Sequence, residues 1–342
     1  MQYPKKMMKP LSILRCTLLV LLTVFIGITV SYADVQFTDT NGDEITLPNA
    51  ASRIVCLNGD AAEMLIVLGA GDRVVGLTQT AMNDPVLMAH LRNAENVGDW
   101  QTPSVERILA LHPDAVITYS SSKPKNADQF TAAGISLIYL DCYKINTLEH
   151  DAIAMEQLIG EEEAADAYLS WLNKWADLIS SKTKDISLDA YPRVYIEGYT
   201  DYSAQGTDSG SDMLVTRAKG KNIAQGLQGQ WPKVTPEWVM KEDPAVIIKV
   251  IAAKPDLTLA SAWESLINRA GFKDLTAVTD NNVYIMNGDL TLGPRSPAGL
   301  VYVASLLHPD LFSDISPRDA LVSYADSFVP GADEGETVYP LI

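Results

Sequence analysis

Two copies of one short phrase constrain the fold more than any other feature of this sequence. SVERILALHPDAVITY at residues 104–119 and TPEWVMKEDPAVIIKV at residues 235–250 each place a glutamate two residues after a hydroxyl residue and a proline seven residues after that glutamate. An apolar run, AVIT or AVII, follows. The hydroxyl residue predicts a helix N-cap, and the proline predicts the end of that helix before a buried strand. We therefore expect one helix–strand unit in each of two similar halves.

The same alternation continues on either side of both phrases. Expected strands of the first half are RIVCL (53–57), RVVGLT (73–78), AVITYS (115–120) and SLIYLD (136–141), and those of the second are RVYIEGY (193–199), AVIIKV (245–250) and NVYIMN (282–287). Helical patterns separate them. Near-continuous apolar strands between helices indicate parallel sheets that are covered on both faces. The predicted fold class is α/β, with two Rossmann-like lobes of mostly parallel strands.

A helical segment joins the two predicted lobes. Its apolar residues recur at steps of three and four, at Leu158, Ala165, Tyr168, Trp171, Leu172, Trp175 and Leu178. This spacing predicts one long helix that buries an aromatic face in the core, because a flexible linker would be rich in Gly, Ser or Pro. The predicted boundaries are 1–33 for a signal segment, 34–147 for the first lobe, 148–187 for the linking helix and 188–342 for the second lobe.

Residues 1–33 have the pattern of a secretory signal. Four basic residues precede or begin an apolar run of about fifteen residues, and Ser31-Tyr32-Ala33 supplies a small-residue cleavage site. Cys16 lies before the apolar run rather than after it, so a lipoprotein site is not expected. Cleavage after Ala33 is the prediction, and an uncleaved membrane anchor is the alternative, because the apolar run approaches spanning length.

The charge balance limits the classes of partner. The chain of 342 residues has a formal net charge of −17, and removal of residues 1–33 leaves 22 basic against 43 acidic residues, a balance of −21. Nucleic-acid phosphates would be repelled by such a chain, which suits a protein exported from the cytoplasm. Only Cys56 and Cys142 remain after residue 33. Two buried free thiols are the prediction, and one disulfide bond is the alternative.

The sequence contains no motif that would make the chain an enzyme. Gly206-Thr207-Asp208-Ser209-Gly210 has the wrong order for a nucleophile elbow, and there is no Walker loop. The histidines are scattered, so no metal site is predicted. We expect a binding protein, with a secreted α/β enzyme as the alternative from another class.

Ligands of open α/β sheets bind beyond the carboxyl ends of the strands. Polar and aromatic residues gather at these ends and before the repeated helices. Aromatic faces and one arginine suit a bulky, partly anionic ligand. The predicted ligand-binding residues are Asn58, Thr80, Trp100, Tyr199, Tyr202, Trp231 and Arg295.

Four stretches together resemble a family of proteins. RIVCLNGDAAEMLIVLGAGDRVVGLT, VGDW with SVERILALHPDAVI, TPEWVMKEDPAVII and PRSPAGLVYVASLLHPDLF are similar, in this order, to the substrate-binding proteins of ABC importers for iron chelates, haem and cobalamin. The resemblance implies a class III periplasmic-binding-protein fold with its ligand in a cleft between the lobes. It also implies that Glu106 and Glu237 dock onto the two permease subunits.

The resemblance suggests two kinds of ligand. Trp100 matches a cleft tryptophan of the cobalamin-binding member, although Thr80 stands where that member has a tyrosine, and Arg295 matches a cleft arginine of several iron-chelate and haem binders. The prediction is an extracytoplasmic protein, monomeric when free, that delivers a ferric siderophore or haem to an ABC-importer permease. A cobalamin or other corrinoid is the alternative ligand. No cofactor of its own and no nucleic-acid partner are expected.

Overall fold

The computed structural model describes residues 1–2, 34–252, 257–333 and 335–341. The predicted signal segment lies almost wholly outside these residues. Residues 34–342 form one compact unit. The lobe boundaries at residues 147 and 187 therefore stay predictions. Within the described residues, no helix is both long enough and apolar enough to cross a membrane.

The first sheet is wholly parallel and has the order β5-β4-β3-β6-β7. Its strands are β3 (Ile54–Cys56), β4 (Val74–Leu77), β5 (Glu95–Asn96), β6 (Ala115–Thr118) and β7 (Leu137–Tyr139). All residues of β3 and β6 are buried, as the apolar runs predict for strands covered on both faces. A separate antiparallel hairpin, β1 (Val35–Thr38) and β2 (Glu44–Leu47), precedes the sheet.

The second sheet has the order β12-β11-β10-β8-β9 and is parallel except for its last edge strand. Its strands are β8 (Arg193–Glu197), β9 (Lys221–Asn222), β10 (Val246–Ile251), β11 (Val283–Asn287) and β12 (Val338–Tyr339). The antiparallel β12 and the short β5 and β9 carry too few residues for a periodic signal, and the sequence did not predict them. The α/β class with two mostly parallel sheets is confirmed.

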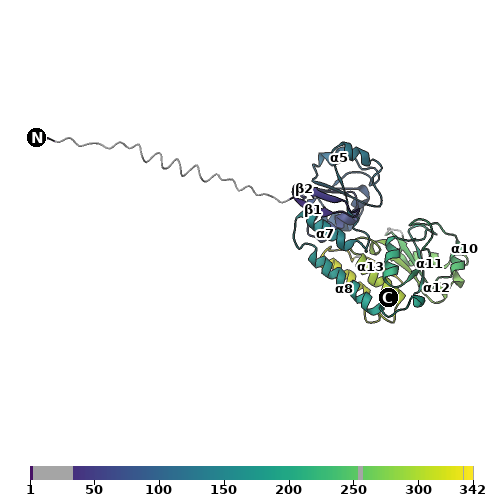
Figure 1. The fold of residues 1–342 in the computed structure, drawn as a ribbon. Coiled ribbons are helices and arrows are strands. Elements are labelled where there is room, and N and C mark those ends of the chain that lie inside the picture. Colours follow the sequence, from purple (N-terminus) through teal and green to yellow (C-terminus); the bar gives the residue numbers. More distant parts are fainter. Residues whose placement is uncertain (3–33, 253–256, 334, 342) are drawn as a thin grey trace. The chain divides into compact units, whose positions relative to one another are not determined.

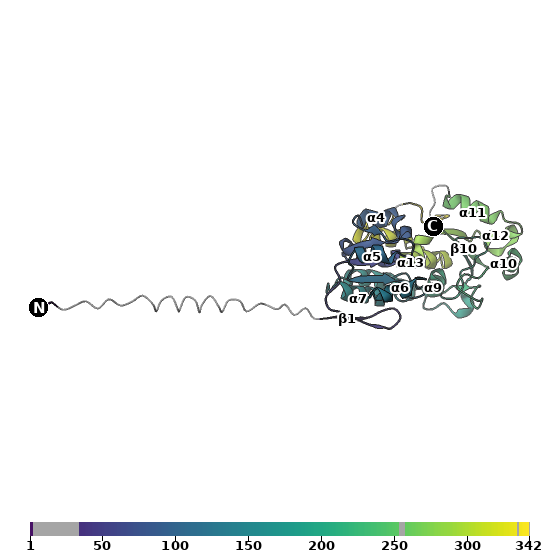
Figure 2. The ribbon, with the colours of Figure 1, turned by 90° about the horizontal axis from the view of Figure 1, so that it is seen from above.

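Helices connect the strands of both sheets (Figure 1). They are α2 (Gly59–Val67), α3 (Gln79–Met82), α4 (Pro85–His90), α5 (Val105–Ala110), α6 (Ala127–Ala132), α9 (Gly210–Arg217), α10 (Pro236–Glu242), α11 (Leu259–Ile267), α12 (Thr276–Thr279), α13 (Ser296–Leu307) and α14 (Pro317–Ser327). Figure 2 shows α4, α5 and α6 around the first sheet and α10, α11 and α12 around the second. The two sheets thus organise two lobes of one unit.

The repeated phrase forms the predicted helix–strand unit in each lobe, α5 with β6 and α10 with β10. Ser104 Oγ accepts a hydrogen bond from the backbone N–H of Arg107 at 3.3 Å, and Thr235 Oγ1 accepts one from Trp238 at 3.2 Å. Both residues are therefore N-caps, as predicted. The caps place a glutamate in the first turn of each helix.

The connection between the lobes is helical, but two helices form it. Helix α7 (Leu148–Ile159) ends at Gly160, and α8 (Asp166–Thr183) follows. Gly160 has φ +66°, and a Cβ atom there would lie 2.6 Å from Ala50 Cβ. Both the left-handed backbone and the close contact require glycine, so the chain turns where the periodicity alone suggested continuation.

The aromatic stripe of α8 packs in the core, as predicted. Tyr168, Trp171 and Trp175 are buried, and Trp171 Nε1 donates to Ser323 Oγ of α14 at 2.9 Å. One apolar cluster contains these rings together with buried residues of both sheets, such as Ile117 and Ile248. The two lobes therefore share part of one apolar core.

Candidate functional site: an interlobe cleft

A cleft with two cavities lies where strand ends of the two sheets face each other. The first cavity has a volume of about 400 Å³ and the second about 450 Å³. Residues that follow β3, β4 and β6 line one side, and residues that follow β8 and β11 line the other. The cleft thus occupies the carboxyl edges of both sheets, where the sequence placed it.

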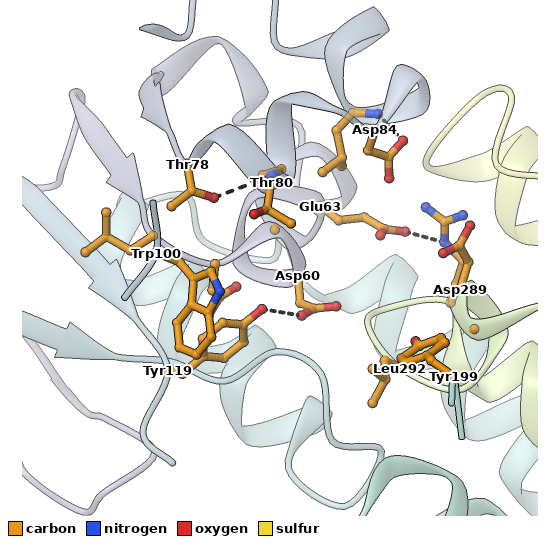
Figure 3. A pocket seen from close by; sticks show the side chains of 17 residues that line it. Asp60, Glu63, Thr78, Thr80, Asp84, Trp100, Tyr119, Tyr199, Asp289 and Leu292 are labelled. Atoms are coloured by element: carbon orange, nitrogen blue, oxygen red, sulfur yellow. Dashed lines mark hydrogen bonds and ion pairs between the residues drawn. The ribbon is translucent and has the colours of Figure 1, made fainter. Parts of the chain in front are cut away.

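The first cavity is named here the acidic compartment, because four carboxylates and one arginine line it. Figure 3 shows Asp60 with Trp100 and Tyr119 on one side and Asp289 with Tyr199 on the other. Its full lining is Leu57, Asn58, Gly59, Asp60, Glu63, Thr78, Thr80, Ala81, Asp84, Leu87, Trp100, Tyr119, Tyr199, Gly288, Asp289, Leu292 and Arg295.

The second cavity is named the aromatic compartment, because its charged residues are few and its rings many. Its lining is Asp60, Trp100, Tyr119, Ser121, Ser122, Tyr143, Gly198, Tyr199, Thr200, Ser203, Gln205, Asp208, Ser209, Gly210, Ser211, Gln230, Trp231, Val250, Thr291 and Leu292. Serine hydroxyls and glutamine amides surround the rings. Such a surface binds the flat or apolar part of a ligand and its hydrogen-bonding edge.

Five residues line both compartments, so the two cavities form one continuous cleft. They are Asp60, Trp100, Tyr119, Tyr199 and Leu292. Trp100 meets Tyr119 edge to face at 6.1 Å between ring centroids, and Tyr119 meets Tyr143 in the same way at 5.6 Å. These contacts fix the rings before any ligand arrives.

Asp60 has an unusual electrostatic environment. Burial, and then the charge of Glu63, raise the pKa of Asp60 to about 7, although a hydrogen bond from Tyr119 Oη at 3.2 Å and the charge of Arg295 oppose the shift. Burial also raises the pKa of Asp289 on the opposite side. Both carboxyls are therefore easier to protonate than an ordinary aspartate, and a ligand that donates hydrogen bonds would favour their charged forms.

Arg295 lines the cleft, as expected for a ligand contact. It also forms an ion pair within the protein, which the sequence did not predict. Its Nε donates to Glu63 Oε1 at 2.9 Å, and Tyr324 Oη donates to the same oxygen at 2.7 Å. Burial would lower the pKa of Arg295, but the charge of Glu63 more than offsets it and raises the pKa. Glu63 lies on α2 in the first lobe, so this buried ion pair joins the two lobes.

The other predicted ligand-binding residues of the cleft differ in whether their side chains are available to bind a ligand. Asn58 lines the acidic compartment, but its Oδ1 caps α2 and its Nδ2 donates to the carbonyl of Leu140 at 2.8 Å. Thr80 is exposed on α3 in the same compartment, and Trp231 is 64% exposed in the aromatic compartment. Thr80 and Trp231 are therefore accessible, whereas Asn58 already uses its amide.

The structure does not bring Tyr202 into the cleft. Its ring packs against Phe272 at 6.2 Å and under the guanidinium of Arg269 at 4.7 Å, and it borders the apolar cluster of the second lobe. Its position in a polar strand-end loop suggested a ligand contact. The loop turns at Tyr202, with φ +58°, and directs this side chain toward the core.

Glu106 and Glu237 are both exposed, one in each lobe. Each lies in the first turn of its helix, α5 or α10. Hydrogen bonds from its own backbone N–H and from the Thr235 hydroxyl lower the pKa of Glu237, so this carboxylate is charged at neutral pH. Neither residue lines the cleft.

Sequence reasoning missed several residues of the cleft. Asp60, Tyr143 and Asp289 lie at the polar strand ends where the ligand was expected, but nothing in the sequence ranks them above their neighbours as ligand contacts. Tyr119 adjoins a strand as well, but it continues the apolar run AVITY and carries no separate signal of a ligand contact. Glu63 carried no signal, because it lies within a buried helix and gains its importance only from Arg295.

The described residues hold no group of three or more His, Cys, Asp or Glu side chains that could bind a metal ion. Cys56 and Cys142 are buried free thiols, as predicted. Burial raises the pKa of each thiol, so both stay protonated and unreactive at neutral pH.

Comparisons with known proteins agree on one family. A family model described as a periplasmic binding protein matches residues 54–290, more than half of the chain. The chain is 28% identical over 288 residues to an uncharacterized ABC transporter substrate-binding lipoprotein of Bacillus subtilis. This alignment covers 82% of this chain and 87% of that protein. The chain is 29% identical over 213 residues to the vitamin B12-binding protein of Yersinia pestis, over 60% of this chain and 71% of the relative.

The fold is also that of a solved structure. A TroA-like periplasmic binding protein FepB from Veillonella parvula superposes with a TM-score of 0.75 at 21% identity, over 90% of this chain and all of that one. The likeness shows that the two proteins share a fold. This chain belongs to the family of periplasmic binding proteins.

Proposed function

We propose that this protein captures a large metal chelate in the interlobe cleft and delivers it to the permease of an ABC importer. The chain is an extracytoplasmic solute-binding protein rather than an enzyme, because that is what its family does. The proposal adds the class of ligand. In this proposal the protein needs no cofactor of its own, since any metal arrives inside the ligand.

The size and the rings of the cleft carry the proposal. Connected cavities of about 400 and 450 Å³ exceed what a single ion or small anion needs. Trp100, Tyr119 and Tyr143 offer rings from the first lobe, and Tyr199 and Trp231 offer rings from the second. A bulky, partly flat ligand would touch both lobes at once.

The charge of the cleft favours a corrinoid among such ligands. Glu63 and Arg295 neutralise each other, and Asp84 is occupied as the N-cap of α4, which leaves Asp60 and Asp289 to meet the ligand. The ionised forms of these two carboxyls repel haem propionates and other anionic groups. The amide N–H groups of a corrinoid would instead donate to them. The similarity to a vitamin B12-binding protein supports the same choice.

An iron chelate, the first prediction from the sequence, is the second candidate. One observation favours it: among the described residues, the two terminal nitrogens of Arg295 have no hydrogen-bond partner, although the residue lines the acidic compartment. These nitrogens could meet one carboxylate of a ferric siderophore or of haem.

A fluorescence titration tests the ligand class. We expect cyanocobalamin to quench tryptophan emission with a dissociation constant on the order of 1 μM or lower, because Trp100 and Trp231 line the cleft. Haemin and ferric siderophores should bind more weakly. N-acetyltryptophanamide corrects for absorption by the ligands, and the Trp100→Phe/Trp231→Phe variant should lose most of the quenching. Tight binding of a ferric siderophore without binding of cyanocobalamin would favour the second candidate.

The affinity for cyanocobalamin should depend on pH through Asp60. The pKa of about 7 means that Asp60 is mostly protonated below pH 7, and an amide donor binds the ionised form better. We expect the affinity to rise with pH from 6 to 8, with a limiting slope of about tenfold per unit below the pKa. Glu63, Tyr119 and Arg295 face the same carboxyl and stay unchanged in this comparison.

Matched variants identify the titrating group. Asp60→Asn should remove the pH slope, whereas Asp208→Asn, an exposed aspartate of the aromatic compartment, should keep it. A slope that survives in Asp60→Asn, or a wild-type affinity that does not vary with pH, would contradict the assignment.

Glu106 and Glu237 are the proposed contacts with the two permease subunits. Both are exposed, both lie in a first helical turn, and one belongs to each lobe. Basic residues of two like subunits could therefore bind one glutamate each. We propose that the free protein is a monomer.

A further inference from the structure

Four charged residues form a cluster beneath one loop of the cleft, named here the Glu197 cluster. Glu197 ends β8 and is fully buried; Lys249 of β10 and Arg269 are nearly so, and Asp201 is exposed. Lys249 Nζ lies 2.5 Å from Glu197 Oε1 and 3.0 Å from Asp201 Oδ1. Arg269 forms a bidentate pair with Glu197 at 2.8 and 2.9 Å and meets Asp201 at 2.7 Å.

The Glu197 cluster holds the loop of residues 198–203. Glu197 Oε2 accepts the backbone N–H of Tyr202 at 2.9 Å, and the guanidinium of Arg269 covers the Tyr202 ring. Asp201, a member of the same loop, is bound to both cations of the cluster. Tyr202 has φ +58°, a conformation that costs free energy for a non-glycine residue and persists only when its surroundings impose it.

Tyr199 is the residue that this loop presents to the ligand. Its side chain is 54% exposed and lines both compartments of the cleft. On its other side it rests against Gly288, where a Cβ atom would lie 2.5 Å from the tyrosine hydroxyl oxygen. Figure 3 shows Tyr199 across the cleft from Trp100 and Tyr119. The position of the Tyr199 ring therefore depends on the backbone conformation of the 198–203 loop.

Stability alone does not explain a buried cluster of this kind. Removing charges from water is costly, and apolar residues of similar volume commonly stabilise a fold as well or better. The charged atoms here instead fix the geometry of one turn through a backbone N–H, a ring face and a loop carboxylate. Burial works to raise the pKa of Glu197, but the hydrogen bonds of Arg269 and the charge of Lys249 hold it below the ordinary value, so Glu197 stays ionised.

We propose that Glu197, Lys249 and Arg269 are positioning residues that set ligand affinity by holding Tyr199 in the cleft. The inference rests on the proposed binding of a chelate there. None of the three has to touch the ligand. Their effect passes through the 198–203 loop to one aromatic ring.

A double-mutant cycle tests the coupling with cyanocobalamin as the probe. Tyr199→Ala and Arg269→Met should each weaken binding about tenfold, and the double variant should be no weaker than the weaker single variant. Arg269→Met combined with Trp100→Ala, which alters the opposite lobe, should give multiplied losses. Multiplied losses for the pair Arg269→Met and Tyr199→Ala would overturn the proposal, as would an unchanged affinity in Tyr199→Ala.

Hydrogen exchange separates this proposal from the proposed function. In Arg269→Met, and in the milder Asp201→Asn if the first variant does not fold, the amide of Tyr202 should exchange at least about tenfold faster, while amides of β3 in the first lobe keep wild-type rates. Unchanged protection at Tyr202 would overturn the proposal. Loss of protection in a protein that binds neither cyanocobalamin nor a ferric chelate would support the holding of the loop and refute the proposed ligand class.

Discussion

Replacing both Glu106 and Glu237 by alanine is expected to reduce transport about a hundredfold while leaving ligand affinity unchanged. Both carboxylates are exposed and neither lines the cleft, so the substitutions cannot act through the ligand. Loss of one charge partner at a docking contact commonly weakens association tenfold or more, and the two lobes supply one contact each. Uptake of labelled ligand by cells that carry the variant in place of the native chain measures the first quantity, and fluorescence titration measures the second.

A pair of unrelated surface acids provides the control. Asp128 on α6 and Glu264 on α11 are exposed, one in each lobe, and neither side chain makes a hydrogen bond among the described residues. Asp128→Ala/Glu264→Ala should transport like the wild type, although it loses the same net charge. Normal uptake by Glu106→Ala/Glu237→Ala would show that the two glutamates only stabilise their helices through the helix dipole and do not bind the permease.

Glu63→Gln is expected to lower the free energy of unfolding by about 3–5 kcal/mol, because it leaves the guanidinium of Arg295 buried without its counter-ion. Arg295 is 5% exposed and Glu63 6% exposed, so little solvent reaches the ion pair. The converse variant, Arg295→Met, should cost less, because Tyr324 Oη still donates a hydrogen bond to Glu63 Oε1.

Urea unfolding of four proteins checks this account. The double variant Glu63→Met/Arg295→Met should be closer in stability to the wild type than Glu63→Gln, since no charge remains unpaired, although Tyr324 loses an acceptor. If the double variant were as unstable as Glu63→Gln, the lost stability would come from side-chain packing rather than from an unpaired charge. A loss in Arg295→Met as large as that in Glu63→Gln would contradict the role of the Tyr324 hydrogen bond.

The predictions that succeeded concern features with local causes. The N-caps Ser104 and Thr235, the buried strands β6 and β10 and the apolar stripe of α8 each follow from side chains within a few residues of one another. The placement of the cleft at strand ends also needed only the order of strands and helices. The short edge strands and the break at Gly160 were missed, because a few residues carry no periodic signal.

The candidate site was predicted in outline, and its interior was not. Trp100, Tyr199 and Trp231 line the cleft as expected, but Tyr202 turns into the core of the second lobe. Residues 199 and 202 share one polar loop, but Tyr202 has a left-handed backbone and packs against Phe272 and Arg269. No pattern in the sequence predicts which side chain of such a loop contacts the ligand.

By itself the sequence determined an α/β protein of two similar lobes, because apolar periodicity and capping residues act over a few positions and so are written locally. The tertiary structure alone decided what the charged residues of the cleft do. Glu63 and Arg295 stand 232 positions apart, and Glu197 and Arg269 stand 72 apart. The pKa, the ion-pair partner and the cost of burial of a charged side chain depend on the groups that pack around it. The spacing of residues along the chain does not specify these neighbours.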